Sequence, residues 1–425
     1  MALLPFAPQA TSAAPPALTP LYSFNGGADG GSPLTALAMG SEGVLYGTTS
    51  AGGTGTCPSF SGCGTVFSLT PPSSAGESWT ETVLHNFAGG SGDGAVPQGV
   101  AIGKSGVLYG STAFGGTGSC VGSYVGCGTV FSLTPPATPG GTWTEKVLHS
   151  FDWGTDDGVF PRAGVTLGPG DVLYGATAYG GTGSCVMGCG MVFSMTPPAS
   201  SGGAWTQRVL YDFAGYPTDG GNPSGVGIGR DGVLYGTTYS DGVAGFDGIV
   251  YSLTPAAGPS TGAWTETVLH TFTGNDGSGP LAGVVMGTGG ILYGTTNSGG
   301  ASGVGTVFSL APPVSPGGTW SEAVLHSFAP GAGSADPIGG VAFGSKGALY
   351  GTTYLGGTYD NGAVFELNLS SDGVSWAESV LHQFTGGDDG SNPEAGVVIG
   401  PGGRLYGTAS QKGVSGAGVV FTLKP

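Results

Sequence analysis

The chain has 425 residues, of which 91 are glycine, 30 are proline and 10% are aromatic. That aromatic content excludes a disordered chain, so the glycines are expected in turns between short strands. With 9 basic and 26 acidic side chains the formal net charge is −17, which argues against binding to DNA or RNA.

The chain begins with an apolar, uncharged segment rich in alanine and proline, MALLPFAPQATSAAPPALTP. This segment resembles the tail of a secretory signal peptide. We therefore expect residues 1–18 to be an unstructured stub or signal remnant, followed by a single domain over residues 19–425. The sequence contains no run of 18 apolar residues, so no transmembrane helix is predicted.

From there on, one repeat dominates the sequence. The tripeptide Leu-Tyr-Gly recurs seven times, starting at Leu45, Leu108, Leu173, Leu234, Leu292, Leu349 and Leu405. Each copy reads, in order, GVAIG, GVLYGTT, a Gly-rich loop, GTVFSLTPP, a second loop, WTETVLHSF and a loop of the form GGxDGxxP. Four of these segments are rich in Val, Tyr, Phe, Thr and Leu and are bounded by turn residues, which predicts four strands. Four short strands per copy are typical of propeller blades.

The two ends of the chain complement each other. Leu21–Phe24 matches the end of a fourth strand, such as Leu84–Phe87, and Gly418–Leu423 matches a third strand. The last copy therefore lacks its fourth strand, which the N-terminus is expected to supply, removing an open sheet edge. The prediction is an all-β, seven-bladed β-propeller with four antiparallel strands per blade. The predicted blades are 33–87, 97–151, 161–213, 223–272, 280–328, 337–384, and 393–424 together with 19–24.

The repeat resembles the glycine-valine (GloVer) tandem-repeat propeller family of secreted bacterial proteins. The matching motifs are LYGTT with a following glycine pair, as in Leu45–Thr49 with Gly52 and Gly53, and GTVFSL, as in Gly64–Leu69. The resemblance covers residues 21–424. It implies a propeller fold and an exported location, and no activity.

The six cysteines form three close pairs in the loops after LYGTT, Cys57/Cys63, Cys120/Cys127 and Cys185/Cys189. None of the pairs has the four converging ligands that a zinc site needs. Three local disulfides formed in an oxidising compartment are therefore predicted, and with them a secreted, extracellular or cell-surface location.

The first strand of each blade is expected to line the central channel. Its channel-facing residues are predicted to be Ala38, Ala101, Thr166, Gly227, Val285, Ala342 and Val398. These side chains are small and only Thr166 carries a polar group, which argues against a buried catalytic centre.

Several polar and aromatic residues recur at fixed repeat positions. An aspartate precedes Gly in six loops, at Asp29, Asp93, Asp157, Asp219, Asp276 and Asp389. These carboxylates could bind Ca²⁺ or polyhydroxyl ligands, but their periodicity favours a structural role in closing each turn.

All five histidines share one repeat position, which in the two other copies holds Tyr22 or Tyr211. A position that accepts His or Tyr indicates a hydrogen-bonding aromatic at a blade edge rather than a metal ligand. The six tryptophans that start the fourth strands are expected to pack between blades.

Residues that break the repeat on the Gly-rich face are the candidate ligand-binding residues. The predicted set is Phe114, Trp153, Arg162, Tyr179, Tyr239, Phe246 and Tyr354, and further departures occur at Phe160 and Glu394. Aromatic platforms beside carboxylates are typical of sugar-binding sites. The alternative is ordinary loop packing.

Three function classes remain open. The favoured class is a secreted non-catalytic binding or scaffold propeller, which recognises a glycan or an extracellular protein through its Gly-rich loop face. The second is an extracellular carbohydrate-active hydrolase or lyase that uses loop carboxylates, with Asp152/Asp156 or Asp241/Asp247 as the candidate pairs. The third is a self-assembling surface protein, favoured by the low content of charged residues. No cofactor is predicted, and the oligomeric state is open.

Overall fold

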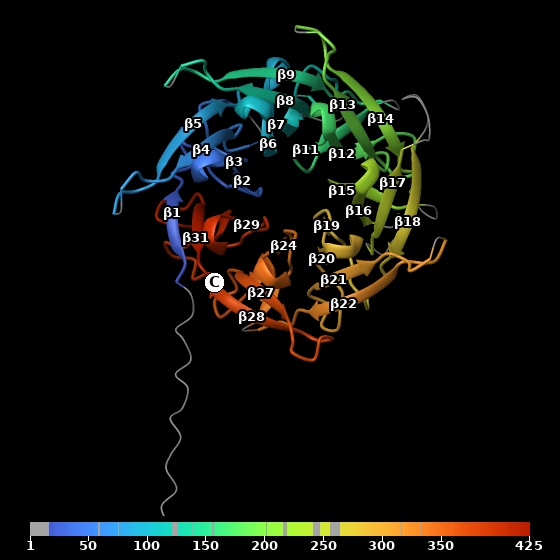
Figure 1. Ribbon diagram of the computed structural model, residues 1–425. Coiled ribbons are helices and arrows are strands. Elements are labelled where there is room, and N and C mark those ends of the chain that lie inside the picture. The colour runs from blue at the N-terminus through green and yellow to red at the C-terminus, as the bar shows by residue number, and fades with distance from the viewer. Residues whose placement is uncertain are drawn as a thin grey trace, which may run out of the picture.

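The computed structural model describes residues 17–425 except 58–59, 75, 121–125, 139, 155–156, 201, 216–218, 241–246, 256–263, 316 and 332. Seven antiparallel sheets stand around a central axis, each with its first strand innermost (Figure 1). The predicted all-β, seven-bladed propeller is confirmed. The predicted blade boundaries and the N-terminal stub stay predictions, and residues 1–16 lie outside the described residues.

Strand bounds follow the four segments of the repeat. Blade 1 contains β2 (Ala38–Met39), β3 (Leu45–Thr49), β4 (Thr65–Thr70) and β5 (Thr80–Asn86). Blade 2 contains β6 (Gly94–Ile102), β7 (Leu108–Gly115), β8 (Thr129–Thr134) and β9 (Thr144–Ser150). Blade 3 contains β10 (Gly158–Pro161), β11 (Thr166–Leu167), β12 (Leu173–Gly180), β13 (Met191–Thr196) and β14 (Thr206–Asp212). Blade 4 contains β15 (Gly221–Ile228), β16 (Leu234–Ser240), β17 (Ile249–Thr254) and β18 (Thr265–Thr271).

The second half of the ring has the same order. Blade 5 contains β19 (Val285–Met286), β20 (Leu292–Thr296), β21 (Thr306–Ala311) and β22 (Ser321–Ser327). Blade 6 contains β24 (Ala342–Phe343), β25 (Leu349–Thr353), β27 (Ala363–Leu369) and β28 (Trp376–Gln383), and β23 (Ser334–Ala335) pairs with β26 (Leu355–Gly356) beside it. Blade 7 contains β29 (Val398–Ile399), β30 (Leu405–Ala409), β31 (Val419–Leu423) and β1 (Thr19–Ser23). Short 3₁₀ turns occupy Ser41–Gly43, Gly90–Gly92, Lys104–Gly106, Pro169–Asp171, Arg230–Gly232, Thr288–Gly290, Ser345–Gly347 and Pro401–Gly403.

The glycine of each Leu-Tyr-Gly motif makes room for a ring on the neighbouring strand. In blade 1, Gly47 pairs with Phe67, and a Cβ added to Gly47 would lie 2.5 Å from Phe67 Cζ. No real Cβ contact is that short, so only glycine allows the ring to lie across the second strand. The repeated tripeptide is therefore a packing requirement of the blade.

Consecutive blades are joined by buried aromatic pairs. The ring that follows the fourth strand of one blade meets the ring of the third strand of the next, at centroid distances of 5.0–5.3 Å and in edge-to-face geometry. The seven pairs are Phe24–Phe67, Phe87–Phe131, Phe151–Phe193, Phe213–Tyr251, Phe272–Phe308, Phe328–Phe365 and Phe384–Phe421. All of these side chains are at most 2% exposed. Truncating one such ring to alanine would cost about 3–5 kcal/mol.

Tryptophans at or just before the start of the fourth strands add a second aromatic contact between blades. Five of them lie 5.6–6.4 Å, between ring centroids, from the tyrosine of a Leu-Tyr-Gly motif in the preceding blade. The pairs are Trp79–Tyr406, Trp143–Tyr46, Trp205–Tyr109, Trp264–Tyr174 and Trp320–Tyr235. Trp376 packs against the core cluster at the interface of blades 5 and 6. The predicted packing role of these tryptophans is confirmed.

The N-terminal strand closes the ring, as predicted. β1 pairs antiparallel with β31, with Thr19 opposite Thr422 and Ser23 opposite Val419. The Phe24 amide then donates to the Gly418 carbonyl at 3.0 Å. Phe24 also forms the aromatic pair with Phe67 of blade 1, so one segment completes blade 7 and its interface with blade 1.

Deleting residues 1–24 is expected to lower the melting temperature and to cause self-association, because it removes β1 and exposes the edge of β31. Differential scanning calorimetry and light scattering measure the two effects. Deleting residues 1–16 is the matched control, and it should melt like the full chain. A monomeric 25–425 protein with an unchanged melt would show that β1 does not contribute to closure.

Candidate functional site

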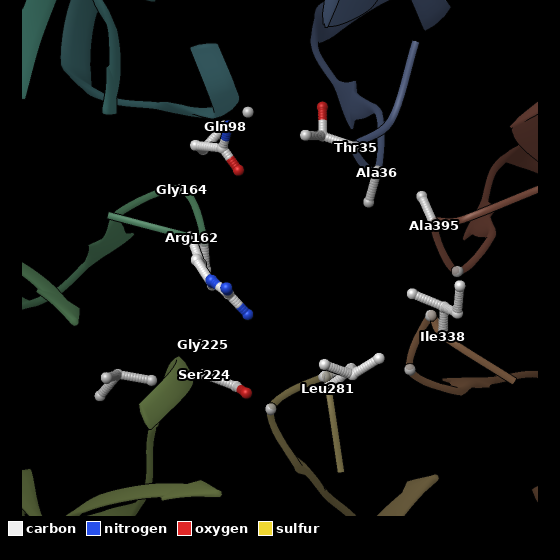
Figure 2. Close-up of a pocket in the computed structure, with 18 of the residues that line it drawn as sticks. Thr35, Ala36, Gln98, Arg162, Gly164, Ser224, Gly225, Leu281, Ile338 and Ala395 are labelled. Atoms are coloured by element: carbon white, nitrogen blue, oxygen red, sulfur yellow. The ribbon is translucent and has the colours of Figure 1, made fainter. Parts of the chain in front are cut away.

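A cavity of about 710 Å³ lies on the axis of the ring, where the loops before the innermost strands converge. Figure 2 shows side chains from around the ring facing it, with the guanidinium of Arg162 and the methyl group of Ala36 pointing inward. All seven blades contribute to the lining. The principal lining residues are Thr35, Ala36, Gln98, Arg162, Ala163, Asn222, Ser224, Tyr239, Leu281, Ala282, Ile338, Glu394 and Ala395.

Five of the seven lining segments accept a hydrogen bond from the hydroxyl of the residue that follows Leu-Tyr-Gly in the preceding blade. In blade 2, Ser111 Oγ donates to the carbonyl of Ala163 at 2.8 Å. In blade 6, Thr352 Oγ1 donates to the carbonyl of Ala395 at 2.7 Å. Thr237, Thr295 and Thr408 make the corresponding bonds to Ala282, Gly339 and Thr35. The polar residue after Leu-Tyr-Gly thus fixes the backbone that forms the cavity wall.

Most of the residues predicted to face the channel do not line this cavity. Of the seven predicted residues only Thr166 and Gly227 line the cavity. The others, Ala38, Ala101, Val285, Ala342 and Val398, lie one or two residues beyond the lining segment of their blades. The physical reason is that five of the innermost strands have only two residues, so the wall is built by the loop that precedes them. The cavity is consequently more polar than predicted, and Gln98, Ser224 and Asn222 were missed.

Arg162 is the basic residue of this lining, and Tyr179 on β12 positions it. Arg162 Nη2 donates to the Tyr179 hydroxyl at 3.3 Å, and its guanidinium carbon lies 5.7 Å from the centroid of the Tyr179 ring. Two predicted ligand-binding residues therefore contact each other, and a third, Tyr239 on β16, lines the same cavity.

An aromatic stack supports Tyr179 from behind. Phe60, Phe114, Phe160 and Tyr179 follow one another at centroid distances of 4.9, 5.1 and 6.2 Å. Phe160 has a φ of +57°, a strained conformation for a bulky residue. Strain of this kind persists only when surrounding packing enforces it. Phe114 packs in this stack, and its ligand-binding role stays a prediction.

The remaining predicted site residues that the structure describes do not line the cavity. Trp153 is 37% exposed, and its backbone amide donates to the Ser119 carbonyl at 3.2 Å. Asp152 accepts a hydrogen bond from the Ser119 amide at 2.9 Å, so it holds a loop of the Gly-rich face. Asp247 and Tyr354 are partly exposed. Asp156, Asp241 and Phe246 lie outside the described residues, so neither predicted carboxylate pair can be described.

Three disulfides link Cys57 to Cys63, Cys120 to Cys127 and Cys185 to Cys189, as predicted. The first closes the loop that carries Phe60, and thereby fixes the far end of the aromatic stack. Disulfides of this kind are typical of proteins that fold in an oxidising, extracellular environment. In the described part of the chain no helix has the length and apolar character needed to cross a membrane.

The repeated aspartates form clasps with the repeated His or Tyr. His85, His149, His270 and His382 each place Nε2 2.9–3.2 Å from the aspartate of the following loop. Tyr22 and Tyr211 donate to Asp29 and Asp219 in the same way. Each carboxylate also accepts a backbone N–H three to five residues upstream, as Asp93 does from Ala88 at 2.8 Å. The structural interpretation of both repeated positions is confirmed.

In four of the six clasps a repeated glutamate of the next blade faces the aspartate, a feature that the sequence analysis missed. Burial, together with the charge of Asp29, Asp219 or Asp276, raises the pKa values of Glu81, Glu266 and Glu322 to about 7. Burial and Asp93 raise the pKa of Glu145 to about 7, although His85 opposes the shift. Two close carboxylates repel each other, which favours the protonated form of the glutamate.

Two departures from the repeat support the interpretation that these glutamates are favoured in their protonated form. Blade 3 has Gln207 in place of the glutamate, and its Nε2 donates to Asp157 at 3.5 Å, so the amide takes the donor role that a protonated carboxyl could take. Between blades 5 and 6, Gly333 replaces the aspartate and His326 lies 3.4 Å from Glu378 directly. Burial opposes ionisation of Glu378, but the hydrogen bond and charge of His326 outweigh it and lower its pKa.

One clasp has the donor set of a metal site. The ligand atoms of His270, Asp276 and Glu322 lie within 4.8 Å of one another. However, the Asp276 oxygens already accept hydrogen bonds from His270 and from the Thr273 amide and hydroxyl. These hydrogen bonds give the arrangement a structural role at the blade interface.

The fold and the axial cavity define a seven-bladed propeller with a binding-site geometry on its Gly-rich face. The chain belongs to the Gloeobacter/Verrucomicrobia repeat family, whose model matches residues 120–335 and 314–425. No curated protein matches the sequence.

Several solved propellers are similar in fold. A glucose dehydrogenase is 15% identical, with 96% of this chain and 100% of that chain covered and a TM-score of 0.44. The extracellular domain of a putative one component system from B. thetaiotaomicron is 11% identical, with 96% of this chain and 41% of that chain covered and a TM-score of 0.51. The Trypanosoma rangeli sialidase in complex with sialic acid is 13% identical, with 98% and 60% covered and a TM-score of 0.43. These likenesses concern the fold.

The glutamate clasps predict a pH-dependent stability. A carboxyl whose pKa is raised by folding stabilises the native state below its unfolded pKa, and that stabilisation is lost as the pH rises through the folded pKa. The pKa values of Glu81, Glu145, Glu266 and Glu322 rise from the usual 4.5 to about 7. The melting temperature should therefore fall by several degrees between about pH 5 and about pH 8.

Replacing these four glutamates by glutamine, as blade 3 does naturally, should flatten that pH profile and raise the melting temperature at about pH 8. Glu77→Gln, on an exposed loop, is the matched control and should keep the wild-type profile. A quadruple variant with the wild-type slope would show that the glutamates do not titrate in this range.

Proposed function

We propose that the protein is a secreted, non-catalytic binding propeller that takes up a glycan or a segment of an extracellular protein at the mouth of the axial cavity. The observation that carries the proposal is the gathering of non-repeated side chains there. Arg162, Tyr239 and Glu394 each depart from the repeat, and all three line one cavity. A structural repeat has no need of such differences at its axis.

The size and chemistry of the cavity support binding of a polar ligand. Its volume of about 710 Å³ lies within the range of small-molecule sites. Thr35, Gln98 and Ser224 offer hydroxyl and amide groups, and the glycine-rich segments between them bring backbone groups to the surface. Groups of these kinds hydrogen-bond to sugar hydroxyls or to peptide groups.

A non-catalytic role is supported by the lining of the cavity. Glycoside hydrolysis ordinarily uses two carboxyl groups about 5–9.5 Å apart. Within the described lining, Glu394 is the single carboxylate residue. The extracellular location is supported by the three disulfides.

A glycan array and a pull-down of extracellular proteins would identify the ligand, and two matched variants would place it. Ala36→Trp should abolish binding, because Ala36 is exposed and points into the cavity (Figure 2). Ala137→Trp, on an exposed loop at the opposite end of the blades, should bind like the wild type. Both variants should keep the wild-type melting temperature.

Normal binding by Ala36→Trp would move the site away from the axis and contradict the proposal. In that case Trp153→Ala is informative, because Trp153 is exposed outside the cavity. Loss of binding in that variant alone would place the ligand on the surrounding loops.

A further inference from the structure

Arg162 gives the axial cavity a particular charge pattern. Its guanidinium points into the cavity (Figure 2). The guanidinium donates a hydrogen bond to the Tyr179 hydroxyl, and this hydroxyl group does not neutralise the positive charge of Arg162. Among the described residues no carboxylate forms an ion pair with it. A guanidinium presents five N–H donors in a planar fork that matches a carboxylate.

Glu394 is the other charged residue of the described lining, and it forms no ion pair with Arg162. Its carboxylate instead accepts a hydrogen bond from Ser410 Oγ at 3.0 Å. Burial raises the pKa of the Glu394 carboxyl, and this hydrogen bond opposes the shift. The Arg162 guanidinium is thus a basic point on a chain whose net charge is −17.

The net charge also limits what kind of anion can approach. A polyanion would be repelled by the acidic protein as a whole, whereas a ligand with one negative charge is repelled much less. The neutral side chains around Arg162, namely Thr35, Gln98 and Ser224, suit hydroxyl groups. A ligand with one carboxylate and several hydroxyls satisfies both requirements.

We infer that the axial cavity binds a short saccharide with a single uronic acid residue, whose carboxylate is held by the Arg162 guanidinium. Tyr179 positions the guanidinium, and the aromatic stack behind it holds Tyr179 in place. This inference rests on the proposed function, because it names the ligand class of the same site.

The test uses matched pairs of disaccharides that differ in one group. Each pair consists of a disaccharide with a terminal uronic acid and its neutral counterpart with a hydroxymethyl group, in the gluco, galacto and manno series. Isothermal titration calorimetry with the full chain should show that at least one acidic member binds more tightly than its neutral partner. Arg162→Gln should weaken binding of that acidic member about tenfold to hundredfold and leave the neutral member unchanged.

Two further variants make the result specific. Arg162→Lys keeps the charge but loses the planar fork, so it should give an intermediate loss. Arg230→Gln, at the exposed far end of blade 4, changes the net charge equally and should leave both affinities unchanged.

The inference is overturned if no pair shows a preference for the acid, or if the preference survives in Arg162→Gln. The proposed function fails separately, when a ligand found on the array or in the pull-down still binds to Ala36→Trp. A neutral glycan that binds to the wild type and not to Ala36→Trp, with no preference for the acidic members, would support the proposed function and contradict only the inference of a uronic acid ligand.

Discussion

The ring depends on the contacts between consecutive blades, because each four-stranded sheet exposes two faces that only its neighbours can cover. Every interface has a fully buried ring pair, such as Phe87–Phe131, and six interfaces have an aspartate clasp beside it. The ring pair supplies the apolar contact, and the clasp fixes the loop that leads into the next blade. The same loop then forms the wall of the cavity, so the geometry of the candidate site depends on these interfaces.

This arrangement divides the residues of each loop into two groups. Asp157 belongs to the repeated group, and it ties His149 of blade 2 to the loop that enters blade 3. Arg162, five residues later, belongs to the group that differs from blade to blade and reaches the axis. The repeated group determines where the backbone runs. The variable group can therefore change without loss of the fold, which is how one fold can carry different binding sites.

The sequence was sufficient for the fold because its signals are local or periodic. The strands follow from short apolar segments between turn residues, and closure follows from the match between Leu21–Phe24 and the ends of the other fourth strands. The cavity lining was not predictable in the same way, since it depends on where each short inner strand begins relative to the axis. The role of Glu145 was missed because its partner, Asp93, lies far away in the sequence, in the loop between blades 1 and 2. The glutamate that recurs in the WTET segment was a sequence signal for this role, and the sequence analysis overlooked it.

The division between ring-building and ligand-facing residues can be tested without a ligand, by hydrogen–deuterium exchange of two variants in one loop. Asp157→Asn removes a charge that His149 and Gln207 both contact, so exchange should become faster in β9 and β14. Arg162→Gln should leave exchange in all blade strands at the wild-type rate. Faster exchange of the blade strands in Arg162→Gln, or none in Asp157→Asn, would contradict the account.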